Sequence, residues 1–152
     1  TTSVLYRIMT QMQTQIQALA LTGISSSSVV VKWLPRQFDT TTDPVPAIVI
    51  CPAPIPETHP NQLTATDNLG YPILVAMIDK QNQDYVANLA RNTLWRQKLS
   101  REFRYQNLDS AIPEVIHVIP EPKAIIDQAW FAANCWYSGI VFRVLSRESR
   151  GN

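Results

Sequence analysis

The stretch YPILVAMID at residues 71–79 decides the fold. Apolar side chains occupy both its odd and its even positions, and Asp79 ends it. Because successive side chains of a strand point to opposite faces of a sheet, this run predicts a strand that is covered on both faces. The stretch AIVIC at residues 47–51 has the same character. We therefore expect two central strands in one sheet.

Three further strands are expected on either side of this pair. β-branched and aromatic residues, which favour strands, fill 29–34 (VVVKWL), 115–119 (VIHVI) and 134–147 (NCWYSGIVFRVLSR). Prolines end the first of these runs and bracket the second, which sets their lengths.

Two amphipathic helices are predicted, at 3–21 and 82–105. The first has apolar residues at the spacing of one helix face, namely Val4, Ile8, Met12, Ile16 and Leu19. Ser3 can cap its start, and Gly23 follows its end. The glutamines between the apolar positions are expected to face solvent or a partner: Gln11, Gln13, Gln15 and Gln17. The second helix has a broad apolar stripe that should cover the sheet: Tyr85, Leu89, Trp95, Leu99 and Phe103.

The order of elements is therefore α-β-β-β-α-β-β. We expect an α+β fold in which a single mixed or mostly antiparallel sheet of about five strands has both helices packed on one face. The chain has 152 residues, of which 45% are hydrophobic and 16% charged, and this predicts one folded domain over 1–152. Residues 149–152 are expected to form a short mobile tail. Because no run of about 18 apolar residues occurs, no transmembrane helix and no membrane contact are predicted.

Residues 52–69 are the most unusual segment, because four prolines fall within nine residues. A stiff segment of this length usually has a function, and we expect a proline-rich loop or a protruding β-hairpin arm. The candidate interface residues are Pro54, Ile55, Pro56, His59 and Leu63 in this segment, and Trp130 and Phe131 in a loop predicted at 121–134. The aromatic pair has a second interpretation, as a plug over the open end of the core.

Basic residues gather toward the end of the second helix, at Arg91, Arg96, Lys98, Arg101 and Arg104. Arg143 and Arg147 point to the same face of the last strand. These seven residues are candidates for charges that line a channel for nucleic acid or form ion pairs between subunits. The alternative is a solvated helix face that pairs with acids such as Asp84 or Glu102. The net charge of +1 predicts no strong attraction of the whole domain to nucleic acid.

The sequence contains no grouping of residues that is typical of a catalytic, metal or cofactor site. The glycines are isolated, so no phosphate-binding loop is predicted. His59 and His117 have no nucleophile or paired cysteines beside them, so we predict no catalytic residue, no metal site and no cofactor. Cys51 and Cys135 each lie in an apolar run and are expected to be buried free thiols.

The order of elements and several local phrases together resemble the tail-terminator and neck proteins of tailed bacteriophages, which join the tail to the head. The phrases are WLP at 33–35, PAIVI at 46–50, GYPILV at 70–75, LWRQ at 94–97 and YSGIVFRV at 137–144. The proline-rich length of 52–69 departs from a minimal terminator, which leaves the position within the virion open.

The resemblance implies a structural protein of the virion without enzymatic activity. Such a protein forms a homo-oligomeric ring, with six-fold symmetry favoured and twelve-fold symmetry also allowed. Its expected partners are the tail tube protein, a head-completion or connector protein, and the DNA that passes through the ring in transient, non-specific contact. Its expected location is the neck or tail of the virion, and the host cytoplasm during assembly.

Two other functions remain open from the residues alone. A monomeric cytoplasmic adaptor could use the segment PAPIP at 52–56 as a polyproline II ligand for an aromatic groove. A small metal-dependent hydrolase could use scattered acids such as Asp67, Asp79 and Asp84, of which Asp79 ends a strand.

Overall fold

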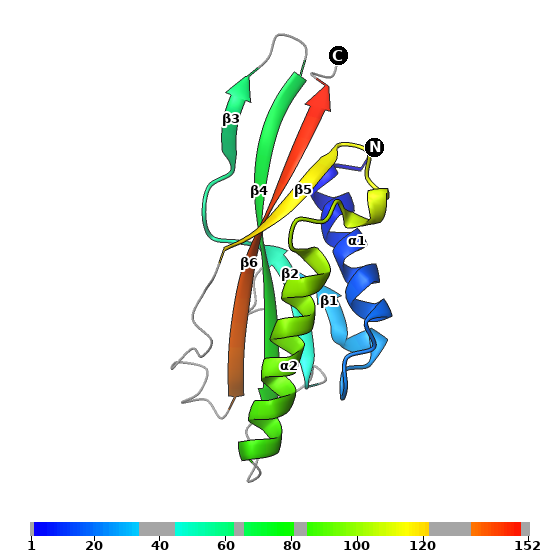
Figure 1. The fold of residues 1–152 in the computed structure, drawn as a ribbon, viewed down its shortest axis with the longest axis vertical. Helices are drawn as coiled ribbons and strands as arrows, with labels where there is room; N and C mark the ends of the chain where they lie inside the picture. Colours follow the sequence, from blue (N-terminus) through cyan, green and yellow to red (C-terminus); the bar gives the residue numbers. More distant parts are fainter. Residues whose placement is uncertain (1, 34–44, 63–65, 81–84, 122–134, 150–152) are drawn as a thin grey trace.

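The computed structural model of the chain describes residues 2–33, 45–62, 66–80, 85–121 and 135–149. Its elements in chain order are α1 (Val4–Ala18), the short turn η1 (Ser26–Ser28), β1 (Val29–Val31), β2 (Ala47–Pro52), β3 (Thr58–Gln62), β4 (Thr66–Lys80), α2 (Tyr85–Phe103), the turn η3 (Leu108–Ser110), β5 (Val115–Glu121) and β6 (Cys135–Ser149). The predicted α+β class, with one mixed sheet and both helices on one of its faces, is confirmed (Figure 1).

The sheet has the order β1-β2-β4-β6-β5, with β3 paired to β4 outside this path. Only β1 and β2 are parallel, and every other pair is antiparallel. β4 and β6 pair along their full lengths, from Thr66 opposite Ser149 to Lys80 opposite Cys135. This two-stranded ribbon runs along the long axis of the molecule (Figure 1).

β2 and β3 occupy the same edge of β4, one after the other. β2 pairs with residues 73–78 of β4, and β3 pairs with residues 67–70. The prolines between the two strands account for the interruption, because proline donates no ladder hydrogen bond. Of the two structures expected for 52–69, a loop or a β-hairpin arm, the structure shows the hairpin: its strands are β3 and the start of β4, although the letters TDNLG at 66–70 are polar.

One face of the sheet carries the main core. Ile8, Met12 and Ile16 of α1 and Trp95, Leu99 and Phe103 of α2 are all buried there. The rings of Phe103 and Phe142 meet edge to face at 5.3 Å between centroids. Each large side chain buried in this way contributes about 1.5–3 kcal/mol, so these contacts fix both helices on the sheet.

The other face of β2 and β4 has a second buried cluster, as the apolar letters at both odd and even positions predicted. Its members are Ala47, Val49, Cys51, Ala53, Leu74, Ala76, Ile78 and Val141. Cys51 and Cys135 are both buried free thiols, which confirms that prediction. Burial raises the pKa of the Cys51 thiol to about 12, because the thiolate would lose its solvation.

The ends of α1 follow from local chemistry. The Ser3 hydroxyl accepts a hydrogen bond from the Tyr6 backbone N–H at 3.2 Å and caps the start, as expected. The chain then turns through Gly23, whose φ of +83° suits glycine. Gln13 donates to the Val29 carbonyl at 2.8 Å, which ties the helix to β1.

Three details of the prediction are wrong. Gln15 was expected on the exposed side of α1, but it is buried and donates to Glu102 of α2 at 3.0 Å. Leu89 was expected to cover the sheet, but it is 57% exposed. Trp33 was expected in a strand, but β1 ends at Val31 and the indole is 73% exposed.

Other predictions fall outside the described residues. They concern Leu63, the loop with Trp130 and Phe131, the side chain of His59, and residues 150–152 of the tail. In the part of the chain that the structure describes, neither helix combines the length and the apolar character needed to cross a membrane.

Candidate assembly surfaces

The solvent side of α2 carries a continuous row of residues, which we call the outer stripe. It consists of Val86, Ala90, Leu94, Gln97, Arg101 and Arg104, at spacings of three or four residues that place them on one helix face. Val86 is 80% exposed and Leu94 is 42% exposed. The first half of the stripe is thus apolar and open to solvent, and the second half is basic. Such a patch marks an interaction site more often than a random surface does.

The stripe borders an open depression along α2, which is lined by Ala90, Thr93, Leu94, Arg96, Gln97, Ser100, Arg101 and Arg104. This surface is therefore accessible to a partner.

Two of the predicted α2 cations, Arg91 and Arg96, contact the sheet of their own chain. Arg91 donates to the Asp79 carboxylate at 2.6 Å and lies over the Trp95 ring at 5.1 Å. Arg96 donates to the Ser138 hydroxyl and to the Gly139 carbonyl, both at 2.8 Å, and burial lowers the pKa of its guanidinium. Both side chains are therefore anchors between α2 and the sheet.

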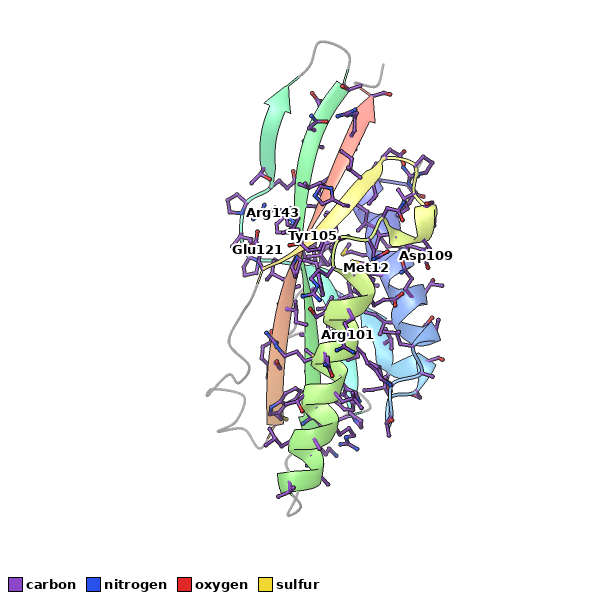
Figure 2. All side chains as sticks on the ribbon, viewed as in Figure 1. Met12, Arg101, Tyr105, Asp109, Glu121 and Arg143 are labelled. Atoms are coloured by element: carbon purple, nitrogen blue, oxygen red, sulfur yellow. The ribbon has the colours of Figure 1, made fainter. Side chains whose placement is uncertain are left out.

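Arg143 and Arg147 are also engaged within their own chain. Arg143 donates to Glu121 of β5 at 2.6 Å, and Figure 2 shows the two side chains close to one another where β5 crosses the sheet. Arg147 donates to the Asn68 side chain of β4 at 3.2 Å. These two arginines stabilise strand pairing, which weakens their assignment as lumen charges.

Lys98, Arg101 and Arg104 keep their place as candidates for contact with a partner. Arg101 and Arg104 are exposed, and Lys98 is half-buried. No ion pair between residues that the structure describes holds any of the three.

The far end of the ribbon forms an arm, which we define as residues 57–62, 66–72 and 143–149. In Figure 1 the arm extends past the helices at one end of the long axis. One of its faces is acidic. Asp67 and Glu148 are direct register partners, and Glu148 accepts hydrogen bonds from the Tyr71 hydroxyl at 2.7 Å and the Ser146 hydroxyl at 2.8 Å.

Tyr71 lies close to two of the acids on this face. Its burial raises the pKa of the phenol, and the hydrogen bond to Glu148 and the charges of Glu148 and Glu57 raise it further. Glu57 is exposed beside it. Glu57, Asp67 and Glu148 therefore surround one part of the arm surface.

Gly70 allows the strands of the arm to approach closely. A Cβ at this position would lie 2.3 Å from the Thr58 hydroxyl oxygen and 3.3 Å from the Arg143 side chain. Thr58 in turn accepts a hydrogen bond from Arg143 at 3.3 Å. Only glycine leaves room for this contact across the ribbon.

A second apolar surface lies between the start of α1 and the edge of the sheet. This groove has a volume of about 310 Å³ and is lined by Ser3, Leu5, Tyr6, Met9, Val31, Lys32, Trp33 and Pro52. Tyr6 and Trp33 are two of these lining residues, and 52% and 73% of their respective surfaces are exposed. The sequence prediction placed Trp33 inside a strand and therefore missed this groove.

The proline-rich segment meets the expectation of an exposed surface only in part. Pro54 and Pro56 are exposed, whereas Ile55 is half-buried and packs against the second core cluster. Ile55 therefore holds the segment against the sheet and is only partly accessible to a partner.

Asp67 and Asp79, the two acids proposed for a hydrolase that lie in the described residues, do not come together. Asp67 and Asp79 lie twelve residues apart on one strand, which is roughly 40 Å, and Asp84 lies outside the described residues. His117 is half-buried on β5. Over the described ranges, no three acidic, histidine or cysteine side chains are grouped so as to hold a metal ion.

Comparison of the chain with models of known protein families gives no match, and comparison with curated protein sequences gives none either. Function is therefore inferred from the residues of the chain itself.

Proposed function

We propose that this chain is a structural virion protein of a tailed phage, a tail-terminator or neck subunit that forms a ring between the tail tube and the head connector. The α+β fold supports the proposal, because the expected order of elements recurs with one additional strand, β3, before α2. In this role the protein carries out no catalysis. Its surfaces contact neighbouring subunits and virion proteins, and DNA passes through the ring.

The observation that carries the proposal is the presence of unlike surfaces on one chain, namely two apolar surfaces and the acidic face of the arm. The outer stripe of α2 exposes Val86 and Leu94, and the groove beside α1 exposes Tyr6 and Trp33. Contact between two different patches of identical subunits is heterologous, and a heterologous contact closes into a ring when the rotation per subunit divides a full turn. A ring of six or twelve subunits needs a contact of this kind.

The test is the native mass of the purified protein with and without isolated tail tubes, together with negative-stain images. The proposal predicts six-fold or twelve-fold rings, either free or formed on the tubes. Leu94→Glu, in the outer stripe, should prevent them, since it places a charge in an apolar contact. Thr14→Glu is the matched control, because Thr14 is exposed on α1, away from both surfaces. If Leu94→Glu still forms rings, the outer stripe is not part of the contact between subunits.

A monomeric adaptor is the alternative, and the exposure of Pro54 and Pro56 favours it. An adaptor predicts a monomer at all concentrations and in the presence of tail tubes. It also predicts that Pro54→Ala/Pro56→Ala abolishes capture by an aromatic-groove domain, whereas the ring subunit tolerates these substitutions with little change in mass.

A further inference from the structure

The charges of this nearly neutral chain are unevenly distributed. Residues 85–104 include five basic and one acidic side chain, whereas residues 57–72 include no lysine or arginine and hold Glu57 and Asp67. Glu148 of β6 adds its charge opposite Asp67, and Arg143 and Arg147 of the arm lie on the other face of β6, because successive side chains of a strand alternate between faces. Figure 2 shows Arg101 near the middle of the long axis, whereas the arm occupies one end.

We infer that the outer stripe of α2 receives the acidic face of the arm of a second copy of this chain. This inference rests on the proposed ring function and names the contact that builds the ring. Arg101 and Arg104 of one copy would face Glu57 and Glu148 of the next. Opposite potentials on two surfaces of one molecule orient a head-to-tail contact and disfavour like-with-like contacts.

The two charged groups have similar spans. Lys98 lies on α2 and Arg104 directly follows the helix, six residues further on, which is about 9 Å along the axis. On the arm, Thr58 is opposite Gly70, so Glu57 is level with Tyr71, four residues or about 13 Å along the strand from Asp67. The basic group is the shorter of the two and can therefore lie within the length of the acidic one.

The composition of the stripe favours a protein partner over nucleic acid. A helix that binds a phosphate backbone presents cations and polar groups along its contact face. Here the first half of the face is Val86, Ala90 and Leu94, and these exposed apolar side chains gain nothing from phosphates. A protein surface can cover the apolar half while its acids meet Arg101 and Arg104.

Charge reversal tests the contact directly. Arg101→Glu/Arg104→Glu should weaken assembly at least tenfold, measured as the protein concentration at which rings dissociate in native mass spectrometry. Arg101→Lys/Arg104→Lys keeps the charges and should assemble like the wild type. Glu57→Lys/Glu148→Lys should weaken assembly to a similar extent. Glu57→Lys alone covers the case in which loss of the Tyr71–Glu148 hydrogen bond impairs folding.

The decisive experiment is to mix the two charge-reversed variants. A helix-reversed chain and an arm-reversed chain should each stay dissociated alone, yet assemble together, because each then offers the other an opposite charge at both contacts. The mixed rings must contain an even number of subunits in strict alternation. Failure of the mixture to assemble, when both variants are folded by circular dichroism, overturns the inference.

The failures of the two proposals are distinguishable. Wild-type rings that are unaffected by all these reversals overturn the docking of the arm and leave the ring function standing. A wild-type chain that stays monomeric even with tail tubes overturns the ring function and the docking with it. Rings that form normally in Arg101→Glu/Arg104→Glu, while binding to a double-stranded DNA oligonucleotide is lost, assign the basic half of the stripe to nucleic acid and overturn the inference.

Discussion

Substitution of Asp79 by asparagine should destabilise the fold far more than loss of an ordinary surface charge. The Asp79 side chain is 3% exposed, and it accepts a 2.6 Å hydrogen bond from Arg91, whose side chain is 30% exposed. Asparagine keeps the size of the side chain and an oxygen for the Lys80 N–H, which donates to Asp79 at 2.9 Å. The substitution therefore removes little more than the negative charge.

The expected magnitude follows from the burial of the pair. Removing one partner of a buried ion pair costs about 3–5 kcal/mol, because the other charge is left without compensation. The partial exposure of Arg91 lets water solvate it in part, so we expect about 2–3 kcal/mol. For a domain of this size that is a fall in Tm of about 5–10 °C.

The assay is urea unfolding followed by circular dichroism, on Asp79→Asn, Arg91→Met and the double variant. Methionine keeps an apolar contact with Trp95 while it removes the charge. The double variant should be more stable than the sum of the single losses predicts, by about 1–3 kcal/mol. A loss below about 1 kcal/mol for Asp79→Asn, or strict additivity, would refute the view that this pair anchors α2. If the wild-type protein shows metal-dependent turnover that Asp79→Asn abolishes, the hydrolase hypothesis is supported instead.

Three further outcomes are expected. Gly70→Ala should lower the Tm, since its Cβ meets the Thr58 hydroxyl at 2.3 Å, and Thr58→Ala in the same chain should recover most of the loss; a normal melt for Gly70→Ala would contradict this. Cys51, whose pKa is raised to about 12, should not react with a thiol reagent at pH 8 until urea unfolds the chain, and rapid native labelling would count against its burial. The hydrogen bond from Arg7 at 2.6 Å lowers the pKa of the Glu114 carboxyl, so this carboxylate stabilises the folded chain at neutral pH and loses that effect as the pH falls below its ordinary range. Glu114→Gln should thus be less stable than the wild type at pH 7 and equal to it at low pH; a difference that does not change with pH would exclude this linkage.

The strands that sequence could predict are those with an unambiguous apolar pattern. YPILVAMID is buried on both faces because its odd-numbered apolar residues lie in the core beneath the two helices, and its even-numbered residues Leu74, Ala76 and Ile78 lie in the second cluster on the other face. The sequence could not decide between a loop and a hairpin arm at 52–69, since residues 66–70 of β4 are mostly polar and owe their strand conformation to pairing with β3 and β6. Tertiary pairing overrides local propensity at such positions.

The candidate surfaces were harder to predict than the core. Leu89 fits the same helical stripe as Trp95 and Leu99, so periodicity alone assigned it to the sheet side. The spacing of Val86, Ala90 and Leu94 was a signal for a second face, but only the position of α2 on the sheet shows which face is exposed. Likewise, the partners of Arg91 and Arg96 lie far away in sequence, so their structural roles depend on the fold.

The central claim is that two unlike surfaces of this chain meet in a closed ring, and the native mass of the wild-type protein beside the two charge-reversed chains tests it most directly. The account predicts six or twelve subunits for the wild type, monomers for each reversed chain alone, and rings with an even number of subunits for their mixture. A wild-type chain that remains a monomer at high concentration and on isolated tail tubes would contradict it.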